Sequence, residues 1–316
     1  MPDQPLFEQL DQAIETLLAG GAPPERAAEL VEIASRLRHL PDERFKTRLK
    51  TELEGRMSMT AAAAAPIREG FRTVTPYISV VEGDKLIEFM KKTFGAEEMS
   101  RHVAPSGHSH AEVRIGDSML MIGYGEMFRG HEKPIALHVY VGDCDAAYAR
   151  AIAAGAKPWG PTAEPGDRPY GERSAHVADA FGNYWYIATR FANNPLPEGY
   201  GTVLPYLHPR KARPFIDFLK NAFGAEEIAV HEYQGRVMHA AARVADSVLE
   251  MGEATEEYGQ MQSGFFMYVN DVDAVYQRAV AAGATSLRPP TDEAVGHRGA
   301  ALVDPFGFGW YVATPL

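Results

Sequence analysis

Residues 75–123 read TPYISVVEGDKLIEFMKKTFGAEEMSRHVAPSGHSHAEVRIGDSMLMIG, and the chain repeats this stretch without a gap as residues 204–252, LPYLHPRKARPFIDFLKNAFGAEEIAVHEYQGRVMHAAARVADSVLEMG. The two stretches are identical at 18 of 49 positions. Unrelated sequences share roughly one position in fifteen, so the repetition predicts a duplicated structural unit.

The similarity continues downstream of this stretch. VGDCDAAYARAIAAGA (141–156) returns as VNDVDAVYQRAVAAGA (269–284), and DAFGNYWYIAT (179–189) returns as DPFGFGWYVAT (304–314). The repetition predicts two domains of one kind. We place them at residues 71–192 and 200–316.

The composition is that of an ordinary globular protein: 316 residues, 46% hydrophobic and 23% charged. A net charge of −11 argues against general affinity for nucleic acid or anionic membranes. The single cysteine, Cys144, excludes an intramolecular disulfide framework, and a cysteine-based zinc site would lack its thiols. The acidic start of the chain and the absence of a long apolar run favour a cytoplasmic protein that does not enter membranes.

The first 56 residues differ from the repeats. Leucine and isoleucine recur there at helical spacing, and prolines and glycines divide the pattern into three short amphipathic helices. Residues 57–70 then read as a linker. Because short isolated helices are marginal in water, this appendage must pack on something, and a homodimer formed through it is one prediction.

Each copy divides again into two halves of the pattern βαβββ. In the first half of the first copy, we expect a strand, an amphipathic helix ending at Gly95 and three more strands: 74–80, 84–95, 97–103, 110–115 and 118–123. The second half repeats the order, with its helix capped by Asp143: 135–141, 144–155, 157–159, 174–178 and 184–189. Four such modules predict an α+β fold.

This arrangement, with PY on the first strand, FGAEE after the first helix, HAEVRIGDSMLMI, and RSAHVADAFGNYWYIAT at the end, resembles the vicinal oxygen chelate superfamily. That superfamily includes glyoxalase I, extradiol dioxygenases and bleomycin-resistance proteins, and the PhnB-like branch is the most similar. The resemblance implies that two βαβββ modules curl into a cup that binds a ligand in its concave face. Fold alone does not determine the chemistry.

In metal-using members of the superfamily, a His or Gln near the start of each module's first strand and a Glu on its last strand bind a divalent metal. The residues at these eight positions are Thr75, Met121, Ala136, Tyr186, Leu204, Glu250, Gly264 and Tyr311. Only Glu250 is a suitable ligand, and one carboxylate does not hold a transition metal. We therefore expect no metal cofactor. His138 and His208, two and four residues beyond their positions, keep open the alternative of a relocated divalent-metal site.

Two groups of side chains are candidates for catalysis or ligand binding. His110 and Glu112 lie two apart on one strand face and, with His138, form a hypothetical acid/base or metal site in the first domain. Because His110 recurs as His239, a packing role is the alternative. We expect a ligand to contact aromatic, acidic and basic side chains in the cups: Tyr77, Arg173, Trp185, Tyr186, Tyr206, Glu250, Arg298, Trp310 and Tyr311. Arg173 and Arg298 have a second interpretation, ion pairs with Asp179 and Asp304.

Three functions are consistent with these patterns. The first is a cytoplasmic protein that binds a small organic molecule in a cup without a metal. The second is a metal-dependent lyase, isomerase or dioxygenase of the glyoxalase type, with its site at His110, Glu112 and His138. The third is an interaction module that acts through the N-terminal helices.

Overall fold

The computed structural model describes residues 67–104, 107–197, 199–293 and 296–316. The helical appendage predicted at 1–56 and most of the predicted linker lie outside these residues. The first copy contains β1 (Val74–Val80), α4 (Gly83–Phe94), β2 (Glu97–Val103), β3 (Ser109–Ile115), β4 (Ser118–Tyr124), a 3-10 turn η3 (Glu126–Phe128), β5 (Ala136–Tyr140), α5 (Cys144–Ala153), β6 (Lys157–Pro158), β7 (Gly166–Arg168), β8 (Glu172–Ala178) and β9 (Tyr184–Arg190).

The second copy follows the same order. It contains β10 (Val203–Leu207), α6 (Ala212–Phe223), β11 (Glu226–Tyr233), β12 (Arg236–Val244), β13 (Ser247–Met251), β14 (Gly264–Tyr268), α7 (Val272–Ala281), β15 (Thr285–Glu293), β16 (His297–Val303) and β17 (Gly309–Pro315). The predicted βαβββ order is confirmed, except that two short strands of the first copy, β6 and β7, take the place of the single strand β15 and both pair with β8. We call β1–β4, β5–β9, β10–β13 and β14–β17, with their helices, modules 1 to 4.

Local signals set the helix ends. Helix α4 ends where Gly95 adopts a left-handed conformation with φ of 69°, and its N–H donates to the carbonyl of Lys91. Only glycine takes this conformation without a steric penalty. Asp143 caps α5 by accepting a hydrogen bond of 2.9 Å from the N–H of Ala146.

The four modules form two sheets, and each sheet takes one module from each copy. Sheet A has the order β15-β16-β17-β14-β1-β4-β3-β2, and sheet B has β11-β12-β13-β10-β5-β9-β8-β6, with β7 paired to β8. The joints are antiparallel: β1 pairs with β14, and β10 pairs with β5. Modules 1 and 4 therefore share sheet A, while modules 2 and 3 share sheet B.

This pairing corrects one expectation, that each copy closes its own cup. The register explains how the exchange works, since Leu204 faces His138 across the β10–β5 joint and Thr75 faces Phe266 across the β1–β14 joint. These are equivalent positions of the two copies. The first-half modules thus present the same edge to either second-half module, and sequence similarity does not decide which pairing forms.

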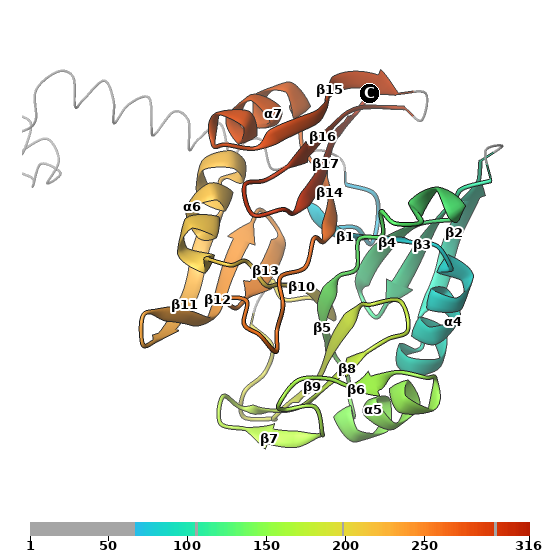
Figure 1. Ribbon diagram of the computed structural model, residues 1–316, viewed down its shortest axis with the longest axis vertical. Coiled ribbons are helices and arrows are strands. Elements are labelled where there is room, and N and C mark those ends of the chain that lie inside the picture. The colour runs from blue at the N-terminus through green and yellow to red at the C-terminus, as the bar shows by residue number, and fades with distance from the viewer. Residues whose placement is uncertain (1–66, 105–106, 198, 294–295) are drawn as a thin grey trace, which may run out of the picture. The chain divides into compact units, whose positions relative to one another are not determined.

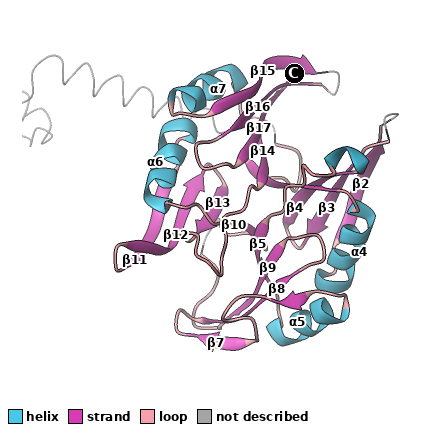
Figure 2. Ribbon diagram, viewed as in Figure 1, coloured by secondary structure: helices cyan, strands magenta, loops and turns pink. Residues whose placement is uncertain are grey.

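On the helix side, each copy stays together. Helix α4 packs on α5, and α6 packs on α7, so that the two helix pairs lie on opposite sides of the strands (Figures 1 and 2). Aromatic rings fill the space beneath: Phe94 lies 4.9 Å from Trp185, and Phe223 lies 4.6 Å from Trp310, between ring centroids. The two modules of one copy therefore pack together through their helices, whereas their strands pair with modules of the other copy.

Candidate functional site

Near the start of β9 and of β17, a tryptophan and the tyrosine that follows it lie on opposite faces of the sheet. Trp185 and Trp310 are fully buried on the helix side, and their indole N–H groups donate to Asp179 and Asp304 at 3.0 and 2.9 Å. The prediction that these tryptophans line a cup is therefore wrong. Because adjacent residues of a strand point to opposite faces, Tyr186 and Tyr311 lie on the concave faces.

Arg173 and Arg298 also lie on the helix side. Arg173 pairs with Asp145 in the first turn of α5 and with Asp167, and Arg298 pairs in the same way with Asp273 of α7 and with Asp292. The prediction that they face a ligand in the cup is therefore wrong. The alternative partners, Asp179 and Asp304, are also wrong, because these carboxylates accept hydrogen bonds within their own turns. The arginines hold strands to helices.

We call the concave faces of sheets A and B cup A and cup B. Cup A brings Tyr77 within 5.7 Å of His110 and 5.3 Å of Tyr311, between ring centroids. Glu112 lies beside this group, where it accepts hydrogen bonds from both ends of the Arg68 guanidinium and from the Ser100 hydroxyl at 2.7 Å. The Glu112 carboxylate is thus already neutralised.

The structure divides the hypothetical site of His110, Glu112 and His138 between the two cups. His110 and Glu112 lie on β3 in sheet A, whereas His138 lies on β5 in sheet B. The physical reason is the exchange of modules, since β5 pairs with β10 of the other copy. The hypothesis that these three residues form one site is wrong.

Cup B instead brings together two residues that were predicted as parts of different sites. His138 of module 2 and Glu250 of module 3 face each other, with Nδ1 of His138 2.7 Å from Oε2 of Glu250. Both side chains are buried. Glu250 Oε1 also lies 3.5 Å from Nε2 of His239, the counterpart of His110. The one surviving carboxylate and the displaced histidine are therefore direct partners.

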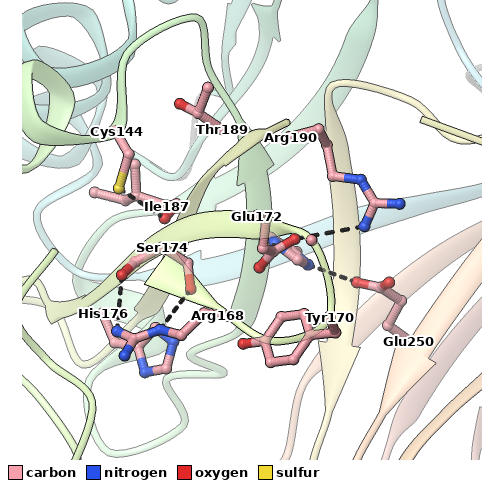
Figure 3. Close-up of polar contacts among 12 residues, drawn as sticks. Cys144, Arg168, Tyr170, Glu172, Ser174, His176, Ile187, Thr189, Arg190 and Glu250 are labelled. Carbon is pink, nitrogen blue, oxygen red and sulfur yellow. Dashed lines mark hydrogen bonds and ion pairs between the residues drawn. The ribbon is translucent and has the colours of Figure 1, made fainter. Parts of the chain in front are cut away.

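A second glutamate and an arginine extend this pair. Glu172 of β8 is buried, with Oε1 3.7 Å from Nε2 of His138 and Oε2 3.6 Å from Nη1 of Arg190. In Figure 3 a dashed line joins Glu172 to Arg190, and Glu250 and the ring of Tyr170 lie nearby. Sequence reasoning missed Glu172 and Arg190; its only available signal was that Glu172 precedes the singled-out Arg173 and so points to the opposite face of β8.

Electrostatics favour the charged form of the His138–Glu250 pair. Burial alone lowers the pKa of His138, but the charge of Glu250 and the hydrogen bond to it outweigh burial and raise that pKa. Burial likewise raises the pKa of Glu250, but His138 and His239 lower it below its usual value. Both shifts favour an imidazolium held by a carboxylate, as expected when two buried partners stabilise each other's charge.

Aromatic rings make up the rest of cup B. Six ring centroids lie within 6.5 Å of the Tyr186 ring: those of Tyr206, His176, Trp159, His208, His138 and Tyr258. Trp159 also stacks on Tyr184 at 3.6 Å. Burial lowers the pKa of His208 to about 4, so its ring is neutral at pH 7. Only Tyr186 and Tyr206 of this set were predicted as ligand contacts. Trp159 ends the predicted strand 157–159 and directly follows β6, and Tyr258 lies between β13 and β14.

Two buried ring nitrogens of cup B lack a hydrogen-bond partner among the described residues, Nε2 of His138 and Nδ1 of His208. Nε2 of His208 shares a hydrogen bond of 2.8 Å with the Tyr186 hydroxyl, whereas Nδ1 is buried and bonds to none of the residues described. A buried polar atom without a hydrogen bond destabilises a fold by about 1–3 kcal/mol. Nδ1 of His208 is therefore a natural anchor for a polar group of a ligand.

The donor set of cup B does not fit the divalent metal of the metal-using relatives. A metal needs imidazole and carboxylate lone pairs directed at one point, but His138 and Glu250 are directed at each other. Glu172 is also beside the guanidinium of Arg190, whose charge opposes a cation. Within the described ranges, no three His, Cys, Asp or Glu side chains are grouped to hold a metal ion.

The fold and the paired cups define a class of protein, and comparison with known families gives the same class. The family model of the Glyoxalase/Bleomycin resistance protein/Dioxygenase superfamily matches residues 73–187 and 210–312. The chain belongs to this superfamily.

An uncharacterized protein of Mycobacterium bovis is 31% identical over 124 residues, which cover 35% of this chain and 82% of the relative. Among solved structures, glyoxalase I from Zea mays superposes with a TM-score of 0.60 and 18% identity, over 76% of this chain and 92% of that chain. A putative dioxygenase from Bacillus subtilis gives a TM-score of 0.51 and 14% identity, over 80% of this chain and 86% of that chain. At these identities, the structural similarity shows the fold. Within the part of the chain described, no helix is long and apolar enough to cross a membrane.

Proposed function

We propose that the protein binds a small organic molecule in cup B without a divalent metal. The observation that carries this proposal is that the His138 and Glu250 side chains, the candidates for metal ligation, bind each other. The neighbouring family position is Tyr186, whose phenol offers stacking and a neutral hydrogen bond in place of a carboxylate. An aromatic or amphipathic ligand with one polar group directed at Nδ1 of His208 fits these contacts.

Two experiments test the proposal. Elemental analysis of protein purified without chelators should find far less than one equivalent of Fe, Mn, Co, Ni or Zn, and near-stoichiometric metal would overturn the metal-free part. A thermal-shift screen over metals, thiol conjugates, aromatic antibiotics and phosphonates should find organic compounds that raise the melting temperature, because a ligand that binds only the folded state stabilises it.

Matched variants then locate the site. Tyr186→Phe should weaken a hit by removing the hydroxyl on His208, whereas Tyr311→Phe, the same change in cup A, should leave its affinity unchanged. Equal effects of the two variants would contradict a site in cup B. Trp159, which lies in cup B while Trp185 and Trp310 are buried in the core, should report binding by fluorescence, and Trp159→Phe should remove the signal.

We also propose finer assignments that rest on sequence alone. The phrases FGAEE and DPFGFGW support the PhnB-like branch, and the single cysteine supports a cytoplasmic location. The helical pattern of residues 1–56 supports a homodimer formed through that segment. Deleting residues 1–60 and measuring the mass in solution tests the dimer, since an unchanged mass would exclude it.

A further inference from the structure

Cup A contains a lysine whose surroundings differ from those of the other described lysines. Lys133 lies in the segment between η3 and β5, where its backbone bridges Ser79 of β1 through hydrogen bonds of 2.9 and 3.4 Å. The side chain is partly buried. It makes no ion pair or hydrogen bond with any residue in the described ranges. Lys85, Lys91 and Lys220 pair with glutamates, and the other unpaired lysines of these ranges, Lys92, Lys157 and Lys211, are exposed to solvent.

Two facing glycines make room for this side chain. Gly264 of β14 and Gly309 of β17 are paired, and Gly264 also pairs with Tyr77 of β1, so the three positions lie in one row on the same face of sheet A. A Cβ added to Gly264 would meet Cδ of Lys133 at 3.7 Å, and one added to Gly309 would meet Nζ at 2.9 Å. The Lys133 stem therefore crosses the strands over both glycines, and the ammonium lies in cup A.

No charged group in the described ranges pairs directly with Lys133, and only Asp304 compensates part of its charge. Arg68 is paired with Glu112, and Arg288 is paired with Glu293. Burial lowers the pKa of Lys133, and the charge of Asp304 opposes this shift although the two side chains form no hydrogen bond or ion pair. The Asp304 carboxylate accepts hydrogen bonds from Trp310, Phe306 and Phe308, and burial raises its pKa to about 6. A desolvated ammonium without a hydrogen-bonded counterion is unfavourable, and an anion bound beside it reduces that penalty.

We propose that cup A is a second binding site, specific for an organic carboxylate whose anionic group pairs with Lys133. The aromatic rings of Tyr77, Tyr311 and Phe266 on the same face would contact the body of the ligand. A monoanionic carboxylate matches one ammonium in charge, which favours it over a phosphate dianion that needs further donors. This site is separate from the one proposed in cup B, so either can fail without the other.

Benzoate and its neutral isostere benzamide test the charge requirement on the full-length protein by calorimetric titration. Benzoate should bind wild type at least about tenfold more tightly than benzamide, a typical effect of one charge-assisted contact. Lys133→Met, which keeps an unbranched stem, should reduce benzoate affinity to the level of benzamide, and Lys133→Arg should keep part of the preference. No saturable binding of benzoate, or a preference that Lys133→Met leaves intact, would overturn the proposal.

Two further variants separate position from folding. Gly309→Ala keeps the lysine but places a methyl group 2.9 Å from its present Nζ position, so it should weaken benzoate severalfold with the melting temperature nearly unchanged. Tyr186→Phe in cup B should have no effect on benzoate. Loss of benzoate binding in Tyr186→Phe together with full binding in Gly309→Ala would place the anion in cup B and contradict the site in cup A.

Discussion

Nδ1 of His138 lies 2.7 Å from Oε2 of Glu250, although the two residues belong to different copies of the duplicated unit. Their equivalents in cup A are Phe266 and Met121, which are apolar. One cup of this protein thus has an apolar floor where the other has a buried ion pair. The apolar residues of cup A therefore show which substitutions of His138 and Glu250 the fold can accommodate.

Replacing only one partner of this pair should be strongly destabilising. His138→Phe leaves the buried Glu250 carboxylate without its imidazolium and should lower the free energy of unfolding by about 3–5 kcal/mol. The double variant His138→Phe/Glu250→Met copies cup A and should lose much less. Urea unfolding of the two single variants and the double variant measures the coupling. A double variant as unstable as the sum of the single variants would show that the pair contributes nothing.

The same pair predicts a pH window for stability. The pKa of Glu250 is lowered in the fold, so its contribution is present above the unfolded value of 4.5 and is lost as pH falls through the folded pKa. The pKa of His138 is raised, so its contribution is complete below the unfolded value of 6.5 and is lost as pH rises through the folded pKa. The stability difference between wild type and the double variant should therefore be largest between pH 4.5 and 6.5. A difference that is constant from pH 4 to about 9 would be inconsistent with an ionised pair.

Two other histidines should act in the opposite direction. Burial lowers the pKa of His208 to about 4 and that of His176 to about 3, so both stay neutral in the fold. Below pH 6.5 the unfolded chain takes up protons at these residues while the folded protein does not, and stability falls as pH decreases. His208→Gln should reduce this pH dependence by about one proton between pH 6.5 and 4. Unfolding free energies measured across this range check it, and an unchanged slope would contradict it.

The exchange of modules predicts the outcome of cutting the chain between the copies. A protease site inserted near Pro195, in the segment between β9 and β10, separates the copies covalently but leaves the joints β1–β14 and β5–β10 intact. The cut protein should elute as one species under native conditions and as two in denaturant. A protease site in the loop after Val103, within the first copy, is the control for the cut itself. Separation of the halves without denaturant would contradict the shared sheets.

The surface arginines should not affect ligand binding. Arg173→Gln and Arg298→Gln remove exposed ion pairs with helices α5 and α7, on the face opposite the cups. Exposed ion pairs contribute little to stability because water screens them. Both variants should bind any cup ligand as wild type does in calorimetry. A large loss of affinity would show that these arginines contact the ligand.

The parts of the fold that follow from short stretches of sequence were predicted correctly. Gly95 ends α4 and Asp143 caps α5 because glycine conformation and side-chain capping act within a few residues. The partnership of modules was not predicted, since both second-half modules offer similar edges to β1 and β10. The contact between His138 and Glu250 was not predicted for the same reason. Each residue was a candidate on its own, but the two meet only because modules 2 and 3 share sheet B.

The faces of the strands explain the remaining errors. Trp185 and Tyr186 are adjacent, so only one of them can line a cup, and the larger and more apolar ring packs against α4. Glu172 and Arg173 are adjacent in the same way, so their side chains point to opposite faces of β8. Glu172 lies in cup B, whereas Arg173, the predicted ligand contact, lies on the helix side. The alternation of side chains along β8 therefore indicates Glu172, and not Arg173, as the residue that faces the cup.

The joint between β1 and β14 has a consequence for how the protein is made. Val74 pairs with Met267, so β1 leaves the ribosome long before its partner strand exists. Modules 2 and 3 are adjacent in the chain and can complete sheet B while module 1 still has an open edge. Contacts between residues so distant in sequence slow folding, and an unpaired strand edge promotes aggregation. Sheet A must therefore be the last part to assemble, and truncation near the C-terminus should leave newly made chains prone to associate through β1.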